Sequence, residues 1–278
     1  MTSTTLDSGT ENAGSLSALS DGLVVAKRNL IKIKRVPDLL VFTTLQPIMF
    51  VLLFAYVFGG AIDVQGSSYK EFLIAGIFTQ TVTFGATLTG AGLADDMQKG
   101  IIDRFRSLPM SRSAVLVGRT VSDVANNLLV VIVMSLTGLV VGWRIRSSVG
   151  DAIIGYALLL LWAYAFSWIM AYVGLLAPSP EVVNNAAFIV IFPITFISNA
   201  FVPLESLSGV LKTFAAWNPL SAVTQACREW FGNIPAEVKT PDYWSLQHAT
   251  TYSLIWIIAI LAIFVPLATR QYSRSASR

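Results

Sequence analysis

The chain has 278 residues, of which 54% are hydrophobic and only 13% are charged, with a net charge of +3. A soluble domain carries about 25% charged residues, so this composition excludes an ordinary water-soluble fold. A single cysteine (Cys227) and a single histidine (His248) exclude an intrachain disulfide and are too few for a metal site.

The N-terminal segment has two parts. Residues 1–20 are rich in Ser, Thr and Gly, and we expect a disordered cytosolic tail there rather than a cleavable signal peptide. Residues 21–37 mix apolar side chains with basic ones, and Asp21 and Pro37 suit the start and stop of a helix. We expect this amphipathic helix to lie in the inner headgroup region, facing anionic lipid; a plain cytosolic anchor for the first span is the alternative.

Apolar stretches long enough to cross a hydrocarbon core about 30 Å thick follow. They cover about 39–60, 72–94, 115–142, 152–177, 182–202 and 250–268. With both termini in the cytosol, the cytosolic segments hold 12 of the basic residues and the outer loops six, although Arg144 and Arg146 on a short outer loop run against this bias. We therefore predict an all-α polytopic membrane protein with six transmembrane helices in one membrane domain at 38–270, and a cytosolic tail at 271–278.

A charged segment at 95–113 separates the second and third stretches and contains KGIIDRFRSLPMSR. Apolar residues recur there at helical spacing, from Leu93 through Met97 and Ile101 to Phe105. Pro109 then ends the pattern. The segment is predicted to form a short amphipathic helix with a basic cytosolic surface; a loop that only enforces topology explains the composition equally well.

Polar residues inside the third stretch are costly in hydrocarbon and therefore informative. Arg119 and Asp123 stand four residues apart, a spacing that allows mutual neutralisation, and Asn126 and Asn127 follow one turn deeper. We interpret this intramembrane polar cluster as an interhelical or intersubunit clamp, in preference to a polar lining of a path across the membrane.

Phenylalanines form a stripe on the fifth stretch. Phe188, Phe192 and Phe196 recur at four-residue steps on one face, and Phe84 lies in the second stretch. Such a stripe usually packs against a helix or lipid; contact with a hydrophobic compound on its path across the membrane is the alternative.

The outer segment at 203–247 holds two apolar stretches that are too short to span a membrane and are split by Asn218 and Pro219. We predict a re-entrant helical hairpin that dips into the outer leaflet, with Trp217 and Trp230 at the interface and Glu229 beside the latter. A compact loop resting on the membrane surface is the alternative.

Two groups of residues carry a resemblance to a known family. GIIDRFRSLPMSR resembles the loop G-x-x-[DE]-R-x-x-x-[LT]-P-x-x-R of the membrane subunits of ABC type-2 exporters, especially the daunorubicin-resistance (DrrB-like) group. ISNAFVPLESL and NPLSAVTQACREW are similar to that group's segments after the fifth span. The resemblance extends over the chain beyond residue 20 in the order of these landmarks.

The resemblance implies that 95–113 is a coupling helix seated in a groove of an ATP-hydrolysing subunit. Ile101, Phe105 and Leu108 would fill that groove, and Arg104 and Arg106 would pair with acidic residues of the partner. The positions that match the family motif are Gly100, Asp103, Arg104, Leu108, Pro109 and Arg112. Lys99 departs from the family pattern, in which an acidic residue is common.

The sequence contains no G-x-x-x-x-G-K-[ST] loop, so we expect no enzymatic activity on this chain, and no cofactor on it, with ATP and Mg²⁺ bound by the partner. The resemblance implies two copies of an ABC ATPase subunit and a second permease subunit, which is either another copy or a sibling. Membrane lipids and a hydrophobic cargo complete the expected partners, and no nucleic acid is expected. The expected location is the bacterial inner (cytoplasmic) membrane, with both termini cytosolic.

The predicted function is that of the permease subunit of an ATP-driven exporter for a hydrophobic or amphipathic compound, such as an antibiotic, another natural product or a lipid. A permease for a polysaccharide or glycolipid is the first alternative. An ion-coupled secondary transporter is the second, and it would use acidic residues at mid-membrane, where only Asp123 lies within the predicted spans.

Overall fold

The computed structural model describes residues 37–58, 64, 68–101, 114–234, 238 and 240–274. The predicted tail at 1–20, all but the last residue of the predicted interfacial helix and most of the predicted coupling segment lie outside these residues.

Within the described residues every regular element is a helix. The first is α2 (Pro37–Leu53), which continues into a π-helical turn, η1 (Phe54–Phe58). The others, in order, are α3 (Tyr69–Gly85), α4 (Thr87–Gln98), α6 (Ala114–Val141), α7 (Val149–Leu176), α8 (Pro180–Phe196), η2 (Leu204–Ser206), α9 (Gly209–Trp217), α10 (Pro219–Trp230), α11 (Trp244–Gln247) and α12 (Ala249–Arg274).

In the part of the chain that the structure describes, four helical segments are long and apolar enough to cross a membrane. They are Tyr69–Gln98, Leu116–Val141, Val149–Leu176 and Ala249–Arg274, whereas the apolar stretches Leu45–Val57 and Pro180–Phe196 are shorter. The 17 residues of α8 would measure about 25 Å at 1.5 Å per residue, which is short for a membrane span. The helix ends at Phe196, earlier than the sequence pattern indicates, and α12 continues to Arg274, into the predicted tail.

Short polar residues and glycines set several helix ends. Ser68 and Ser148 cap α3 and α7 by accepting the backbone N–H of the residue three positions on. Gly142 has a φ of 109° after the end of α6, and the Trp143 N–H donates to the Gly138 carbonyl at 2.8 Å. This closure turns the chain back and buries the Trp143 ring.

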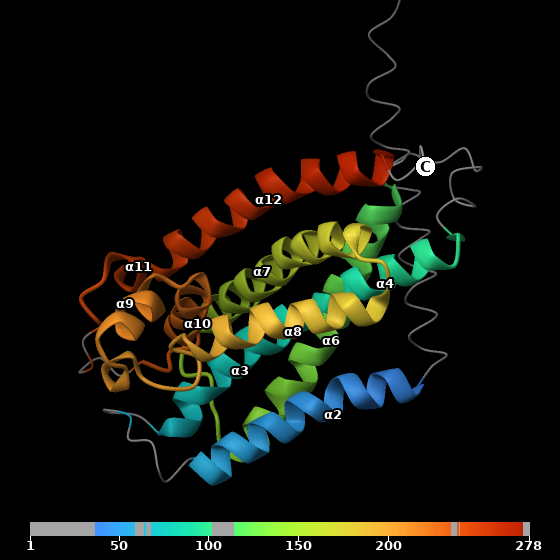
Figure 1. The fold of residues 1–278 in the computed structure, drawn as a ribbon. Helices are drawn as coiled ribbons and strands as arrows, with labels where there is room; N and C mark the ends of the chain where they lie inside the picture. The colour runs from blue at the N-terminus through green and yellow to red at the C-terminus, as the bar shows by residue number, and fades with distance from the viewer. Residues whose placement is uncertain are drawn as a thin grey trace, which may run out of the picture.

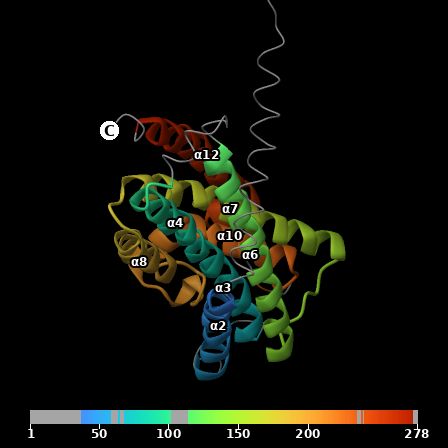
Figure 2. The same ribbon diagram turned by 90° about the vertical axis from the view of Figure 1, so that its right-hand side faces the viewer.

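The long helices lie side by side as an elongated bundle (Figure 1). Helices α9, α10 and α11 gather at one end, whereas the start of α2, the end of α4, the start of α6 and the end of α12 lie at the other. Both views place α2 and α12 on opposite sides of the bundle (Figure 2). The two helices that flank the predicted coupling segment therefore share one end of the bundle with the C-terminal end of α12.

Helix α7 lies at the centre of the packing and contacts α12, α4, α6 and α10. Gly90 of α4 and Gly174 of α7 allow the two backbones to touch, because a Cβ at either position would overlap the facing helix. Trp162 of α7 is buried, and its indole N–H donates to the Thr83 hydroxyl of α3 at 2.9 Å. The close packing fixes α3, α4 and α7 as one unit.

Candidate functional site

A half-open pocket with a volume of about 330 Å³ lies between α2, α3, α4, α6 and α8. It brings together two sets of residues that the sequence analysis treated separately, the phenylalanines and the asparagines. The described residues that line it are Gln46, Pro47, Phe50, Gln80, Thr81, Phe84, Gly85, Thr87, Leu88, Asn126, Asn127, Val130, Asn184, Ala187, Phe188 and Phe192. We call this site the carboxamide pocket, because five of these side chains are Asn or Gln.

The amides differ in depth. Gln46 and Asn184 are exposed and lie at the rim. Gln80 and Asn126 are only 6% and 8% exposed, and neither side chain forms a hydrogen bond with a described residue. Asn127 is engaged, since its amide nitrogen donates to the Asp123 carbonyl at 3.0 Å. Buried amides without partners carry a free-energy cost that a bound hydrogen-bonding group would offset.

The phenylalanines form a stack along α8. The ring centroids of Phe188 and Phe192 are 4.9 Å apart, and those of Phe192 and Phe196 are 4.3 Å apart. Phe84 of α3 joins the stack 6.3 Å from Phe188. The stripe thus packs ring on ring, and Phe84, Phe188 and Phe192 also line the carboxamide pocket. Phe196 does not line it and contacts Phe201 instead.

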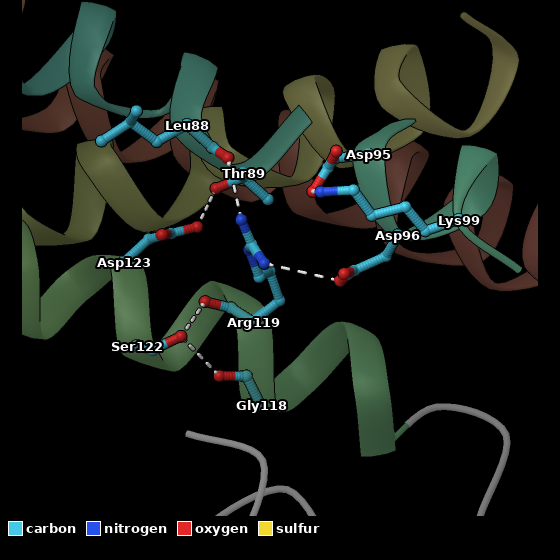
Figure 3. Close-up of polar contacts among 9 residues, drawn as sticks. All are labelled: Leu88, Thr89, Asp95, Asp96, Lys99, Gly118, Arg119, Ser122 and Asp123. Atoms are coloured by element: carbon cyan, nitrogen blue, oxygen red, sulfur yellow. Dashed lines mark hydrogen bonds and ion pairs between the residues drawn. The ribbon is translucent and has the colours of Figure 1, made fainter. Parts of the chain in front are cut away.

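Arg119 and Asp123 belong to a polar clamp between α4 and α6 (Figure 3). Arg119 forms its ion pair with Asp96 of α4, at 3.6 Å, and donates to the Leu88 carbonyl at 3.3 Å. Asp123 accepts a hydrogen bond from the Thr89 hydroxyl of α4. The sequence suggested the pair Arg119–Asp123; the structure instead directs each side chain to the neighbouring helix.

Space for the clamp comes from Gly92 of α4, where a Cβ would overlap the Arg119 guanidinium. The partners Thr89, Asp96 and Gly92 were not identified from sequence. The sequence does carry a signal for them. Residues 89–96, in the second predicted span and just after it, are rich in small and polar side chains, which suit close packing against the third predicted span. The clamp ties together the two helices on either side of the predicted coupling segment.

Of the predicted coupling residues, only Gly100 and Ile101 are described. Gly100 has a φ of 65°, a left-handed conformation that favours glycine, and it follows Lys99, the C-cap residue of α4. The remaining predicted coupling residues, Asp103, Arg104, Phe105, Arg106, Leu108, Pro109 and Arg112, lie outside the described residues.

The outer segment contains two short helices, α9 and α10, which separate at Asn218 and Pro219. Asn218 caps α10 by accepting from the Leu220 N–H, and its Nδ2 donates to the carbonyls of Ile194 and Ile197 at 2.7 and 2.8 Å. These carbonyls belong to the last turn of α8 and the residue after it, where a helix leaves its acceptors unpaired.

The two tryptophans have different surroundings. Trp217 is 45% exposed. Trp230 instead packs against the core, and its indole N–H donates to the Thr250 hydroxyl of α12 at 3.0 Å. Glu229 is exposed and accepts a hydrogen bond from Gln225 at 3.3 Å.

Arg228 of α10 is a buried cation that the sequence analysis did not single out. Its Nε donates to the Phe72 carbonyl of α3 at 2.9 Å, and its Nη2 donates to the carbonyls of Asn199 and Ala200 at 2.8 and 3.3 Å. The guanidinium also lies 3.5 Å above the Phe72 ring. Burial lowers the pKa of Arg228 to about 9, and the group remains a cation at neutral pH.

Asn218 therefore supplies hydrogen-bond donors to the C-terminal end of α8, and Arg228 supplies them to the segment that follows α8. Positive charge near a helix C-terminus is favourable, and α8 has no basic residue in its own last turn. Helix α10 and its cap are thus joined to α3 and α8, the two helices that carry half of the residues lining the carboxamide pocket. Among the described residues, no group of three or more acidic, Cys or His side chains comes together as a metal site.

Comparisons with known proteins match this architecture to transport proteins. A family profile described as ABC-2 type transporter matches residues 22–231. The daunorubicin resistance ABC transporter permease protein DrrB1 of Streptomyces coeruleorubidus is 30% identical over 262 residues, which cover 94% of this chain and 89% of that protein. The probable doxorubicin resistance ABC transporter permease protein DrrC of Mycobacterium tuberculosis is 26% identical over 183 residues, 66% of each chain. The putative transport permease ycf38 of Cyanophora paradoxa is 25% identical over 209 residues, covering 74% of this chain and 72% of that protein.

Proposed function

The chain belongs to the ABC-2 type transporter family and is a transmembrane permease of an ABC exporter, and from this premise we propose that its carboxamide pocket lies on the route of an amphipathic cargo. The observation that carries the proposal is the composition of the pocket. Phenylalanine rings and amide side chains from α2, α3, α6 and α8 lie together in one pocket inside an apolar bundle, and this combination is typical of small-molecule sites.

The cargo class follows from the same pocket and from the relatives. Two of the similar proteins are named for resistance to daunorubicin and doxorubicin, and these names favour an antibiotic or related natural product. A lipid stays within the proposal as a second amphipathic cargo. A polysaccharide fits less well, because the pocket is compact and rich in phenylalanine.

An ion-coupled carrier is disfavoured by the surroundings of Asp123. That carboxylate accepts a hydrogen bond from Thr89 and lies in the same clamp as Arg119, so it serves helix packing. A carrier would need an acidic residue that is free to take up an ion in the pathway.

We propose six spans with both termini in the cytosol of a bacterium, in the inner membrane. The shared end of α2, α4, α6 and α12 supports this orientation, because the basic segments of the chain flank those helix ends. Arg146, which ran against the charge bias, pairs with Glu71 at 2.7 Å and is thereby neutralised. The helices α9 and α10 would then form the outer re-entrant hairpin at 203–247.

We further propose that 95–113 couples the bundle to a separate ABC ATPase, present in two copies, which binds ATP and Mg²⁺. A second permease subunit, another copy or a sibling, would complete the pathway. The clamp at Arg119, Asp96 and Asp123 supports this role, because it would carry motion of the coupling segment into both α4 and α6.

The proposal is tested by purifying the tagged chain gently from its native cell and identifying the proteins that accompany it. Recovery of an ABC ATPase subunit is expected, together with its loss in the double variant Arg104→Ala/Phe105→Ala. Arg144→Ala, at the opposite end of the bundle, is the matched control and should retain the ATPase. A chain that purifies alone and still moves cargo in liposomes without ATP would refute the proposal.

A further inference from the structure

We propose that the carboxamide pocket selects uncharged, ring-bearing compounds, and that Gln80 and Asn126 recognise their carbonyl or hydroxyl groups. This inference rests on the proposed function, because it assigns the cargo's chemistry to the pocket on the proposed route. It narrows the cargo from any amphipathic compound to one whose polar groups are neutral. It also sets this cargo apart from daunorubicin and doxorubicin, for which the relatives are named, because both drugs carry an amino sugar that is cationic at neutral pH.

The charge of the lining is the first observation. None of the described side chains that line the pocket is Asp, Glu, Lys, Arg or His. The charged residues nearest in the sequence to the lining residues of α4 and α6 are paired elsewhere. Asp96 pairs with Arg119, Asp123 accepts from Thr89, and Asp95 pairs with Lys99 at 2.8 Å. A charged group entering the pocket would lose water without meeting a free counter-charge, which is strongly unfavourable.

The unpaired amides are the second observation. Gln80 of α3 and Asn126 of α6 are each more than nine-tenths buried, line the pocket and have no hydrogen-bond partner among the described residues. A carboxamide offers both a donor and an acceptor, so it can pair with a carbonyl, a hydroxyl or an amide of a ligand. A pure hydrocarbon chain would leave both amides unpaired, which disfavours an acyl chain as the group bound at this depth.

The aromatic wall is the third observation. Phe84, Phe188 and Phe192 line the pocket from two helices; Phe188 and Phe192 are stacked, and Phe84 meets Phe188 at a tilt of 57°. Rings of a ligand pack favourably against such faces and edges. A volume of about 330 Å³ lies at the lower end of the range for small-molecule sites, which suits a compact ring system.

The test measures binding of two hydrophobic ring-bearing probes to the purified full chain by scintillation proximity. Tritiated progesterone is a neutral fused-ring compound with two carbonyl groups, and tritiated tetraphenylphosphonium is a cation. We expect the wild type to bind progesterone and to bind tetraphenylphosphonium at least tenfold more weakly. Gln80→Met and Asn126→Leu keep side-chain size and should each weaken progesterone binding about twofold to tenfold, the loss of one net hydrogen bond.

The decisive variant is Gln80→Glu, which keeps the shape of the side chain and adds a negative charge. It should weaken progesterone binding and strengthen tetraphenylphosphonium binding, so that the wild-type preference for progesterone becomes smaller or is reversed. Gln46→Met at the exposed rim provides a second variant with little risk to folding, and it should weaken progesterone binding less than Gln80→Met does. Gln247→Met, an exposed amide outside the pocket, is the control and should bind both probes as the wild type does.

Equal binding of the two probes by the wild type would overturn the inference, as would unchanged progesterone binding in both Gln80→Met and Asn126→Leu. The proposed function is judged separately, by recovery of the ATPase subunit from the same preparations. If the ATPase is recovered and the variants bind both probes as the wild type does, only the proposed selectivity of the pocket is refuted. If wild-type preparations lack the ATPase, the proposed exporter function is refuted, whatever the probes show.

Discussion

Replacing Arg228 by Met should loosen the attachment of α10 to α3 and to the segment that follows α8. The substitution keeps an unbranched side chain of similar reach and removes the guanidinium that donates to the carbonyls of Phe72, Asn199 and Ala200. It also removes the contact of the cation with the Phe72 ring. The hydrophobic part of the side chain is kept, so the decrease in the free energy of unfolding measures the polar contacts of the guanidinium.

The expected magnitude comes from opposing contributions. Hydrogen bonds that involve a charged group contribute about 1.5–3 kcal/mol each, and a carbonyl left buried without a donor costs about 1–3 kcal/mol. Against this stands the desolvation of the cation, which costs several kcal/mol and is relieved by the substitution. We expect a net decrease of about 2–4 kcal/mol in the free energy of unfolding. Arg228→Lys should lose roughly half as much, because an ammonium keeps the charge but not the planar fork.

The assay is equilibrium unfolding of the purified chain in mixed micelles, titrated with SDS and followed by tryptophan fluorescence. Arg144→Met is the matched control. Its side chain is exposed and, among the described residues, donates to the nearby carbonyls of Leu139 and Trp143, so its loss should cost less than about 1 kcal/mol. A change of less than about 0.5 kcal/mol in Arg228→Met would contradict the attachment, as would equal losses for Arg228→Met and Arg144→Met.

Three further predictions concern the packing of the bundle and use the same assay. Gly76→Ala should destabilise the chain by about 1–3 kcal/mol, because the new Cβ meets the Ala200 backbone. Gly150→Ala, in the open first turn of α7, is the control and should be neutral or slightly stabilising. Equal effects of the two substitutions would contradict the close approach of Gly76 to Ala200. Asp96→Asn should destabilise the chain by about 1–3 kcal/mol, because it removes the counter-charge of Arg119. Asp95→Asn breaks the more exposed pair with Lys99 and should cost less than about 1 kcal/mol. A larger loss for Asp95→Asn than for Asp96→Asn would refute the clamp. Trp143→Phe should lose about 1 kcal/mol or more with the indole hydrogen bond to Asn233 (2.8 Å). Asn233→Ala also removes the hydrogen bond to the Arg144 carbonyl (2.8 Å), so the double variant should lose more than Trp143→Phe but less than the sum of the single losses; full additivity would contradict the pairing.

The helical character of the bundle and its family could be predicted from sequence because both depend on short-range features. Stretches of apolar residues specify membrane helices by length and composition, since every backbone polar group in hydrocarbon must be paired within its own helix. The break between α9 and α10 was likewise predicted, because Asn218 caps a helix and Pro219 suits its first position. The exact number of spans is less accessible, since α8 ends at Phe196 where the hydropathy continues.

The polar contacts depended on the facing helix, which periodicity does not identify. Arg119 and Asp123 are one turn apart on α6, yet each turns to α4, where Gly92 leaves room and Asp96 and Thr89 offer partners. In the sequence, Arg228 lies in a predicted outer loop. Only the close approach of α10 to α3 and to the segment after α8 makes it a buried donor.

The sequence by itself thus determined that this chain is a helical membrane protein of the ABC-2 type. Composition, span length and the motif of the charged loop can each be recognised within a short stretch of chain. The tertiary structure decided that Gln80, Asn126 and the phenylalanines of α3 and α8 share one pocket. Their meeting requires helices far apart in the chain to pack at fixed rotations. Those rotations are set by contacts such as Gly76 against Ala200 and Gly90 against Gly174, which join residues distant in sequence.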